Sequence, residues 1–142
     1  IVDDQKQFCT FYLEDRFFGV EVERVQEVFR YQEMTQVPLA PSAVRGLINL
    51  RGQIITAIDL RHRLGMKALP EDQKPMNVVI RTDNDVVSLL VDRIGDVLEV
   101  SDESLEPPPE TLDEVARQLI PGVYKLNDSL LMTLDTEKTL TI

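Results

Sequence analysis

The sequence contains one cysteine and one histidine, Cys9 and His62, and this scarcity removes several classes of protein at once. A single cysteine forms no disulfide within the chain, so a reducing, cytoplasmic environment is expected. The alternation of Cys9 with Phe8, Thr10 and Phe11 predicts a thiol buried in the core. One cysteine and one histidine do not make a zinc site, and neither a metal ion nor a cofactor is expected.

Motifs for nucleotide binding and nucleophilic catalysis are also missing. Neither G-x-G-x-x-G nor G-x-x-x-x-G-K-[ST] occurs, and G-x-S-x-G is not found either. His62 stands in a basic RHR stretch and is not expected to be a catalyst. The acids and amide at 83–85 lack the ligand spacing of a calcium loop and predict a turn. A binding module is therefore favoured over an enzyme, with a small hydrolase built on clustered carboxylates as the alternative.

Long apolar runs are lacking as well, and the charge is unevenly distributed. No run of 18 apolar residues and no signal-peptide pattern is present, so membrane insertion is not expected. The net charge of −10 disfavours nucleic acid and anionic membranes as partners. Yet the basic segment, VRGLINLRGQIITAIDLRHRLG at 44–65, carries four arginines and one histidine against a single acid, Asp59. It predicts either an acidic protein partner or a carboxylate within the fold; solvated arginines flanking a hairpin are the plainer interpretation.

The order of apolar and turn-forming residues predicts a mainly β chain with a few short helices. The stretch EPPPE at 106–110 fits neither a helix nor a sheet. Helical segments are expected at 22–29, 60–65 and 111–119 with Thr111 as N-cap, and 136–142 form either a final helical turn or a frayed tail. Strands are expected at 8–13, 17–22, 47–50, 53–60, 77–82, 86–91 and 98–100, followed by a hairpin over Asn127–Asp128.

A repeat emerges when the two halves are compared at an offset of 69 residues. VEVERVQEV at 20–28 then aligns with LLVDRIGDV at 89–97, and each half predicts a hairpin, an acid–Arg–aliphatic turn and a strand. Two β units that share one core, with a groove between them, agree with this pattern; chance similarity of one short window is the alternative. The identical pairs are Val22/Val91, Arg24/Arg93 and Val28/Val97.

Arg51 stands at the tip between two apolar strands of the basic segment. A planar guanidinium at this place can bind an acidic partner, or it can clamp an acid between the β units. In the structural alternative, Asn49, Arg51 and Gly52 only form a favourable hairpin turn.

These residues resemble the CheW-type coupling domain of bacterial chemotaxis. The shared pattern is F-G-[apolar]-x-[apolar]-x-x-V-x-E-[apolar], a proline-flanked segment, and then G-[apolar]-x-N-L-R-G-x-I followed by D-L. VVSLLVDRIGDVLEV resembles the second-half signature, so the resemblance covers residues 7–140. The family often has Pro where Thr56–Ala57 stands here, which changes local packing. The matching positions are Phe18, Gly19, Val25, Glu27, Pro38, Pro41, Gly46, Asn49, Leu50, Arg51, Gly52, Ile54, Asp59 and Leu60.

The resemblance implies a single domain over residues 1–142 made of two intertwined five-stranded barrels of the Src-homology-3 type. The barrel boundaries are expected to interleave, roughly as 15–75 and 76–142 plus the N-terminal strand. It also implies a non-catalytic scaffold that joins the cytoplasmic tips of chemoreceptors, the methyl-accepting chemotaxis proteins, to the histidine kinase CheA. Such a scaffold lies in the cytoplasm, at the inner face of the membrane, within receptor arrays.

Carried over by position, the family's receptor-binding region becomes an apolar groove between the barrels that takes a receptor helix tip. A second reading keeps the fold but has the domain cut from a larger protein, such as a kinase regulatory domain or an adaptor fused to a receiver domain; the sequence does not begin with Met, which leaves this open. The expected groove residues are Val25, Glu27, Gly46, Asn49, Leu50, Arg51, Gly52, Val86, Val87 and Val97.

Overall fold

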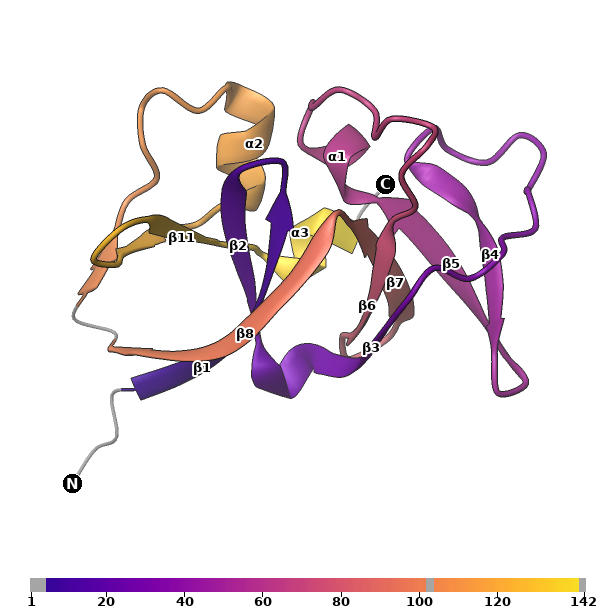
Figure 1. Ribbon diagram of the computed structural model, residues 1–142, viewed down its shortest axis with the longest axis horizontal. Coiled ribbons are helices and arrows are strands. Elements are labelled where there is room, and N and C mark those ends of the chain that lie inside the picture. Colours follow the sequence, from indigo (N-terminus) through magenta and orange to yellow (C-terminus); the bar gives the residue numbers. More distant parts are fainter. Residues whose placement is uncertain (1–4, 102–103, 141–142) are drawn as a thin grey trace.

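The computed structural model describes residues 5–101 and 104–140, and the chain folds into two β-sheets (Figure 1). The six-stranded sheet has the order β8-β1-β2-β11-β10-β9, with β1 (Gln5–Leu13), β2 (Arg16–Glu21), β8 (Arg93–Ser101), β9 (Leu105–Glu106), β10 (Val123–Lys125) and β11 (Leu130–Thr133). The five-stranded sheet has the order β3-β6-β7-β5-β4, with β3 (Val25–Phe29), β4 (Val44–Leu50), β5 (Gln53–Asp59), β6 (Met76–Arg81) and β7 (Val86–Val91).

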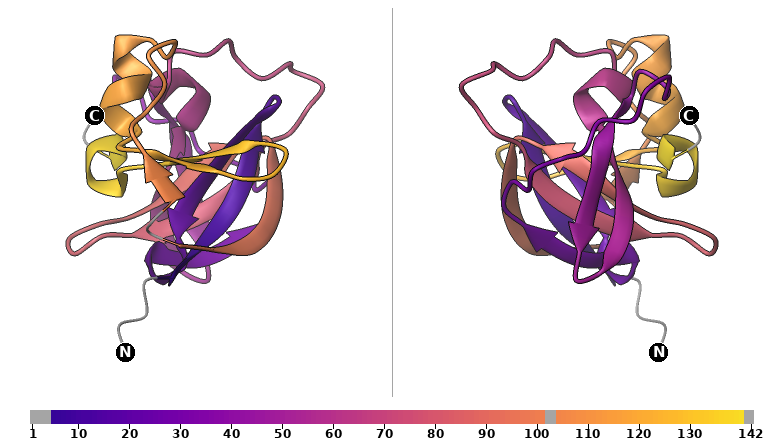
Figure 2. Two further views of the ribbon diagram at one scale, coloured as in Figure 1. Left: turned by 90° about the vertical axis from the view of Figure 1, so that its left-hand side faces the viewer. Right: turned by 90° about the vertical axis from the view of Figure 1, so that its right-hand side faces the viewer.

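Four short helical segments accompany the sheets: η1 (Val22–Arg24), α1 (Leu60–Arg63), α2 (Glu114–Leu119) and α3 (Thr136–Leu140). The helices α1 and α2 lie at the same end of the molecule, at the top in Figure 1 and in both views of Figure 2. Over 5–101 and 104–140, no helix is long and apolar enough to cross a membrane.

The chain crosses between the two sheets twice. It leaves the six-stranded sheet after β2, passes through η1 and enters the five-stranded sheet as β3. It returns at Asp92, the residue between β7 and β8. We call these the outgoing crossing, 22–24, and the return crossing, Asp92. The windows 20–28 and 89–97 that repeat in the sequence are these two crossings with their flanking strands.

The two sheets share one plan. Each contains an antiparallel hairpin, β1–β2 or β6–β7, flanked on one side by a strand that arrives through a crossing, β8 or β3. On the other side lies a parallel partner, β11 or β5, which pairs antiparallel with β10 or β4 and leads into a short helix, α3 or α1. The expectation of two related β units therefore agrees with the topology, although one sheet has six strands rather than five.

The expected boundary between residues 75 and 76 runs through the five-stranded sheet. All strands of that sheet come from the continuous stretch 25–91, and the six-stranded sheet uses the residues on either side of it. The sheets therefore divide the chain at the two crossings.

A single apolar core, here the main core, lies between the sheets. It joins Phe11 and Phe18 of the six-stranded sheet to Ile80 and Leu89 of the five-stranded sheet, and the four side chains are fully buried. Burying such side chains contributes roughly 1.5–3 kcal/mol each to folding. A smaller cluster belongs to the five-stranded sheet alone, with Ile48, Ile55, Ala57, Val79 and Leu90 at its centre.

The predicted helix at 22–29 is wrong. Only Val22–Arg24 is helical, as one 3-10 turn, and 25–29 form the strand β3 paired with β6. The spacing of Val22, Val25 and Val28 fits a helix, but β-branched side chains favour the strand when a sheet edge is within reach.

Three further expectations need correction. The helix expected at 111–119 begins at Glu114, because Asp113 rather than Thr111 is the N-cap and accepts a hydrogen bond from the Ala116 amide at 2.9 Å. Cys9 is half-buried rather than buried, and burial raises the pKa of its thiol. The stretch EPPPE at 106–110 does not lie wholly outside the sheets, because its first residue, Glu106, is the last residue of the short strand β9. The predicted helical turns at 60–65 and 136–140 are confirmed, as are the hairpins; 141–142 lie outside the described residues.

Candidate functional site

The β4–β5 hairpin ends in a two-residue turn whose shape follows from its sequence. Arg51 and Gly52 both have positive φ angles, 53° and 87°, as the mirror-image turns of tight hairpins require. The Asn49 side-chain oxygen accepts a hydrogen bond from the Gly52 amide at 2.9 Å. The turn therefore holds the Arg51 side chain at the tip of the hairpin, as the sequence predicts.

Arg51 binds an acid of the chain itself. Its two terminal nitrogens, Nη1 and Nη2, donate to the two carboxylate oxygens of Glu27 at 2.9 and 2.7 Å. The Arg51 side chain remains 76% exposed, whereas that of Glu27 is 23% exposed. Paired hydrogen bonds of this kind fix orientation as well as distance. Of the expected roles, the clamp on an internal acid is therefore the one that the geometry shows.

The clamp joins the two edges of one sheet rather than two β units. Glu27 lies on β3 and Arg51 follows β4, and these strands stand at opposite ends of the five-stranded sheet. Close by, Thr35 and Leu47 exchange backbone hydrogen bonds of 2.9 and 2.8 Å. Gly46 permits this approach, because a Cβ atom there would lie 2.8 Å from the Thr35 carbonyl oxygen. The ion pair and the bridge thus draw the sheet's edges together.

The expected apolar residues lie in different surroundings. Val25 is half-buried against the main core, and Val87 is buried within it at 9% exposure. Leu50 and Val86 both flank the small cluster of the five-stranded sheet. Val97 lies on β8 of the other sheet and is 57% exposed. The structure therefore brings Glu27, Asn49, Arg51 and Gly52 together and distributes the valines over both sheets.

Val28 is the exposed apolar residue that the sequence argument missed. It lies on the edge strand β3 and is 43% exposed, and the repeat aligns it with Val97 on the edge strand β8. The repeat pairs Val28 with the identical Val97 and could have marked it as a candidate groove residue. The predicted helix at 22–29 instead assigned Val28 to the apolar face of that helix.

The arginines of the basic segment all bind acceptors of the same chain. Arg45 lies 3.6 Å from Asp59, and Arg63 donates at 2.7 and 3.0 Å to the carbonyls of Lys138 and Thr139 in α3. Arg61 is 5% exposed, so reading it as a solvated arginine is wrong. The carboxylate within the fold, and not only a partner, therefore explains why an acidic chain concentrates bases here.

Arg61 and Asp92 form a buried ion pair that sequence reasoning did not identify. Nε and Nη2 of Arg61 donate to the carboxylate of Asp92 at 2.9 and 2.5 Å, and the side chains are 6% and 11% exposed. Burial alone would raise the pKa of Asp92, but hydrogen bonds from Arg61 and the Glu14 amide, with the charges of Arg61 and Arg93, hold that pKa below its ordinary value.

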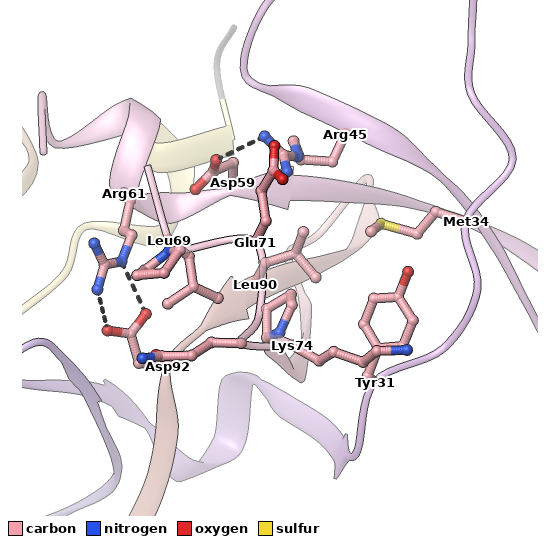
Figure 3. Close-up of a pocket in the computed structure, with 13 residues that line it drawn as sticks. Tyr31, Met34, Arg45, Asp59, Arg61, Leu69, Glu71, Lys74, Leu90 and Asp92 are labelled. Atoms are coloured by element: carbon pink, nitrogen blue, oxygen red, sulfur yellow. Dashed lines mark hydrogen bonds and ion pairs between the residues drawn. The ribbon is translucent and has the colours of Figure 1, made fainter. Parts of the chain in front are cut away.

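A cavity of about 270 Å³ opens beside this pair (Figure 3). Its apolar wall includes Met34 and Leu90, and the Lys74 ammonium lies 4.8 Å from the centre of the Tyr31 ring. Two ion pairs line the polar side of the cavity, Arg61 with Asp92 and Arg45 with Asp59. Among the described residues, no three His, Cys, Asp or Glu side chains gather closely enough to hold a metal ion.

Taken together, these features define a β-rich binding scaffold. Its charged side chains pair with one another, and its surface carries exposed apolar residues, among them Val28 and Val97 on the edge strands β3 and β8.

A family model described as the CheW-like domain matches residues 7–142, and the chain belongs to this family. It is 30% identical over 135 residues to the chemotaxis protein CheW of Klebsiella aerogenes, covering 95% of this chain and 81% of the relative. The probable chemotaxis protein CheW of Rhizobium etli is 32% identical over 132 residues, covering 93% and 85%. The crystal structure of the scaffolding protein TtCheW from Thermoanaerobacter tengcongensis superimposes with a TM-score of 0.85 at 27% identity, covering 96% of this chain and 93% of that one.

The comparisons confirm the resemblance seen in the sequence. The protein is a scaffold of the chemotaxis system and not an enzyme, which sets aside the hydrolase alternative.

Proposed function

We propose that the protein couples the cytoplasmic tips of chemoreceptors to the histidine kinase CheA in signalling arrays. The receptor helix tip lies in an apolar groove between the two β units, with the expected residues from Val25 to Val97 on its walls. The protein thereby stays in the cytoplasm at the inner face of the membrane, without inserting into it and without binding nucleic acid.

The observation that carries this proposal is a pair of exposed valines at equivalent positions. Val28 and Val97 follow the two crossings on the edge strands β3 and β8, and each is more than two-fifths exposed. A contiguous exposed apolar surface is typical of a docking site, and an amphipathic helix lays its apolar face into such a groove. The two valines are the apolar positions that the proposed groove offers to such a helix. The Glu27–Arg51 clamp lies beside Val28 and keeps β3 in place.

A binding experiment with separate partners tests the proposal. Titration calorimetry with a receptor helical-hairpin fragment and with the CheA regulatory domain should give a signal for each. Val97→Asp should weaken receptor binding by about tenfold or more, since a buried, unpaired charge costs well over 1.4 kcal/mol. Kinase binding should change less.

Leu130→Asp is the matched control, because Leu130 is also an exposed apolar residue, at 40%, but lies on β11. It should leave receptor affinity unchanged. Val25→Asp is a poorer probe than the sequence suggests, because Val25 packs against the main core and its loss would disturb folding. Equal receptor affinity of the wild type and Val97→Asp would contradict the proposed groove.

A further inference from the structure

Four segments of the chain meet at the return crossing. The Asp92 carboxylate accepts hydrogen bonds from the Arg61 guanidinium and, at 2.7 Å, from the Glu14 amide in the β1–β2 turn. The Asp92 amide donates to the Tyr12 carbonyl at 3.0 Å. Arg61, in turn, donates to the Lys67 carbonyl at 2.9 Å, in the segment after α1. The crossing is thus tied to both sheets by polar contacts.

The main core alone does not fix how the sheets are oriented. Apolar burial is non-directional, and a core packed from two sheets admits small sliding movements. Arg61 and Asp92 follow the neighbouring parallel strands β5 and β7 of the five-stranded sheet, and their paired hydrogen bonds orient the Asp92 carboxylate. That carboxylate also accepts a hydrogen bond from the Glu14 amide of the β1–β2 turn, which belongs to the six-stranded sheet, so the oriented acid connects the two sheets. Buried polar groups often contribute to structural specificity rather than to net stability.

The return crossing also lies within the second wall expected for the groove. Val86 and Val87 precede it on β7, and Val97 follows it on β8. The strand β8 is held firmly to β1, because a Cβ atom at Gly95 would lie 2.4 Å from Thr10 Oγ1 and that hydroxyl donates to the Asp96 carbonyl. The path of the chain at Asp92 therefore positions Val97 relative to Val86 within this wall.

We propose that Arg61 and Asp92 are positioning residues that hold the two sheets at the orientation in which the groove accepts a receptor helix tip. The second half of this statement rests on the proposed function. The first half, that the pair holds the sheets, does not depend on it.

The sharpest variant replaces both partners with apolar residues of similar size, Arg61→Met with Asp92→Leu. Buried ion pairs exchanged in this way are often neutral or stabilising, so the double variant should fold. The Glu14 amide and the Lys67 carbonyl, which lose their partners, belong to exposed residues that water reaches. With the thermal midpoint retained, affinity for a receptor helical-hairpin fragment should fall about tenfold, as if a tenth of the molecules were competent.

A distance measurement reads the orientation of the sheets directly. Spin labels at Arg81→Cys on β6 and Lys125→Cys on β10, in a Cys9→Ala background, report one distance between the sheets by pulsed electron resonance. The distribution should be narrow with the ion pair and should shift or broaden in the Arg61→Met, Asp92→Leu variant. Ser88→Ala is the matched control, because it removes a buried 2.8 Å hydrogen bond to Asn77 within the five-stranded sheet. It should leave the distribution and the receptor affinity unchanged.

The two readouts separate the possible failures. An unchanged distance distribution in the double variant overturns the positioning role, whatever the binding result. A changed distribution with wild-type receptor affinity overturns the link to the groove. If the wild-type chain itself binds no receptor fragment, the proposed function fails, and the distance distribution still decides whether the pair holds the sheets.

Discussion

The two crossings carry the same sequence pattern and reach opposite physical states. The return crossing places Asp92 at 11% side-chain exposure against a buried arginine. The outgoing crossing has no buried residue, its Glu23 is exposed, and its Arg24 meets Asp83 at 3.9 Å with that acid 90% exposed. The repeat aligns Glu23 with Asp92, so the difference must come from what packs against each crossing.

The short helices that follow β5 and β11 differ at one matching position. Both begin after an aspartate N-cap, Asp59 or Asp135, and the second helical residue is Arg61 in α1 but Glu137 in α3. An arginine at this position can pair with the acid of a crossing, whereas a glutamate cannot. The return crossing therefore has a basic partner in the helix that follows the neighbouring strand β5.

The largest effect expected from this comparison is on stability. Asp92→Ala leaves the Arg61 charge buried without its partner and should lower the free energy of unfolding by about 3–5 kcal/mol. Glu23→Ala, at the aligned and exposed position, should change it by less than about 0.5 kcal/mol. Urea unfolding followed by circular dichroism measures both, and similar losses in the two variants would contradict the comparison.

Acid should weaken the return crossing selectively. The pKa of Asp92 lies below its ordinary value of 3.8, so the pair contributes its full stability above that pH and loses it as the pH falls further. Below pH 3.8 the free energy of unfolding of the wild type should therefore fall more steeply than that of Asp92→Asn. The difference between the two free energies should narrow as the pH falls. Urea midpoints collected from neutral pH downward test this, and a constant gap would argue against it.

The exposed clamp at the hairpin tip should separate binding from stability. Arg51→Glu places two acids close together, at positions 27 and 51. Because the Arg51 side chain is largely exposed, the free energy of unfolding should change by no more than about 1 kcal/mol. Arg51→Ala should behave likewise, and receptor-dependent control of the kinase should weaken in both. Kinase assays in reconstituted arrays measure this, and normal control with normal expression would count against a role for the clamp.

The smallest effect is expected at the outgoing ion pair. Arg24→Gln removes a 3.9 Å contact to an exposed acid and should change the unfolding free energy by no more than a few tenths of a kcal/mol. The same urea experiment applies. A loss above about 1 kcal/mol would mean that the outgoing crossing is locked as well.

Much of the fold follows from the order of residues, because local rules govern it. Alternating apolar residues and the turn-forming residues Asn49, Arg51 and Gly52 predict the β4–β5 hairpin, and the repeat marks both crossings. The strand β3 escapes these rules, because its valines fit a helix until the edge of β6 offers partners. Which strand enters which sheet is likewise a long-range choice that no short window contains.

The site is harder to predict because its pairs join distant parts of the chain. Arg51 and Glu27 meet only after the edges of a sheet approach each other. Arg61 stands between Leu60 and His62 in the basic RHR stretch, which is typical of a solvated surface. Its partner follows the neighbouring strand β7, so the pair forms only once the parallel strands β5 and β7 lie side by side.

The exchange of strands also sets an order of assembly on the ribosome. The hairpin β1–β2 emerges first, but its neighbours β8 and β11 are made last, whereas every strand of the five-stranded sheet comes from 25–91. During synthesis the five-stranded sheet can therefore form while the apolar face of the β1–β2 hairpin is still exposed. The six-stranded sheet is therefore completed only after residues 93–133 have been made, long after its first hairpin.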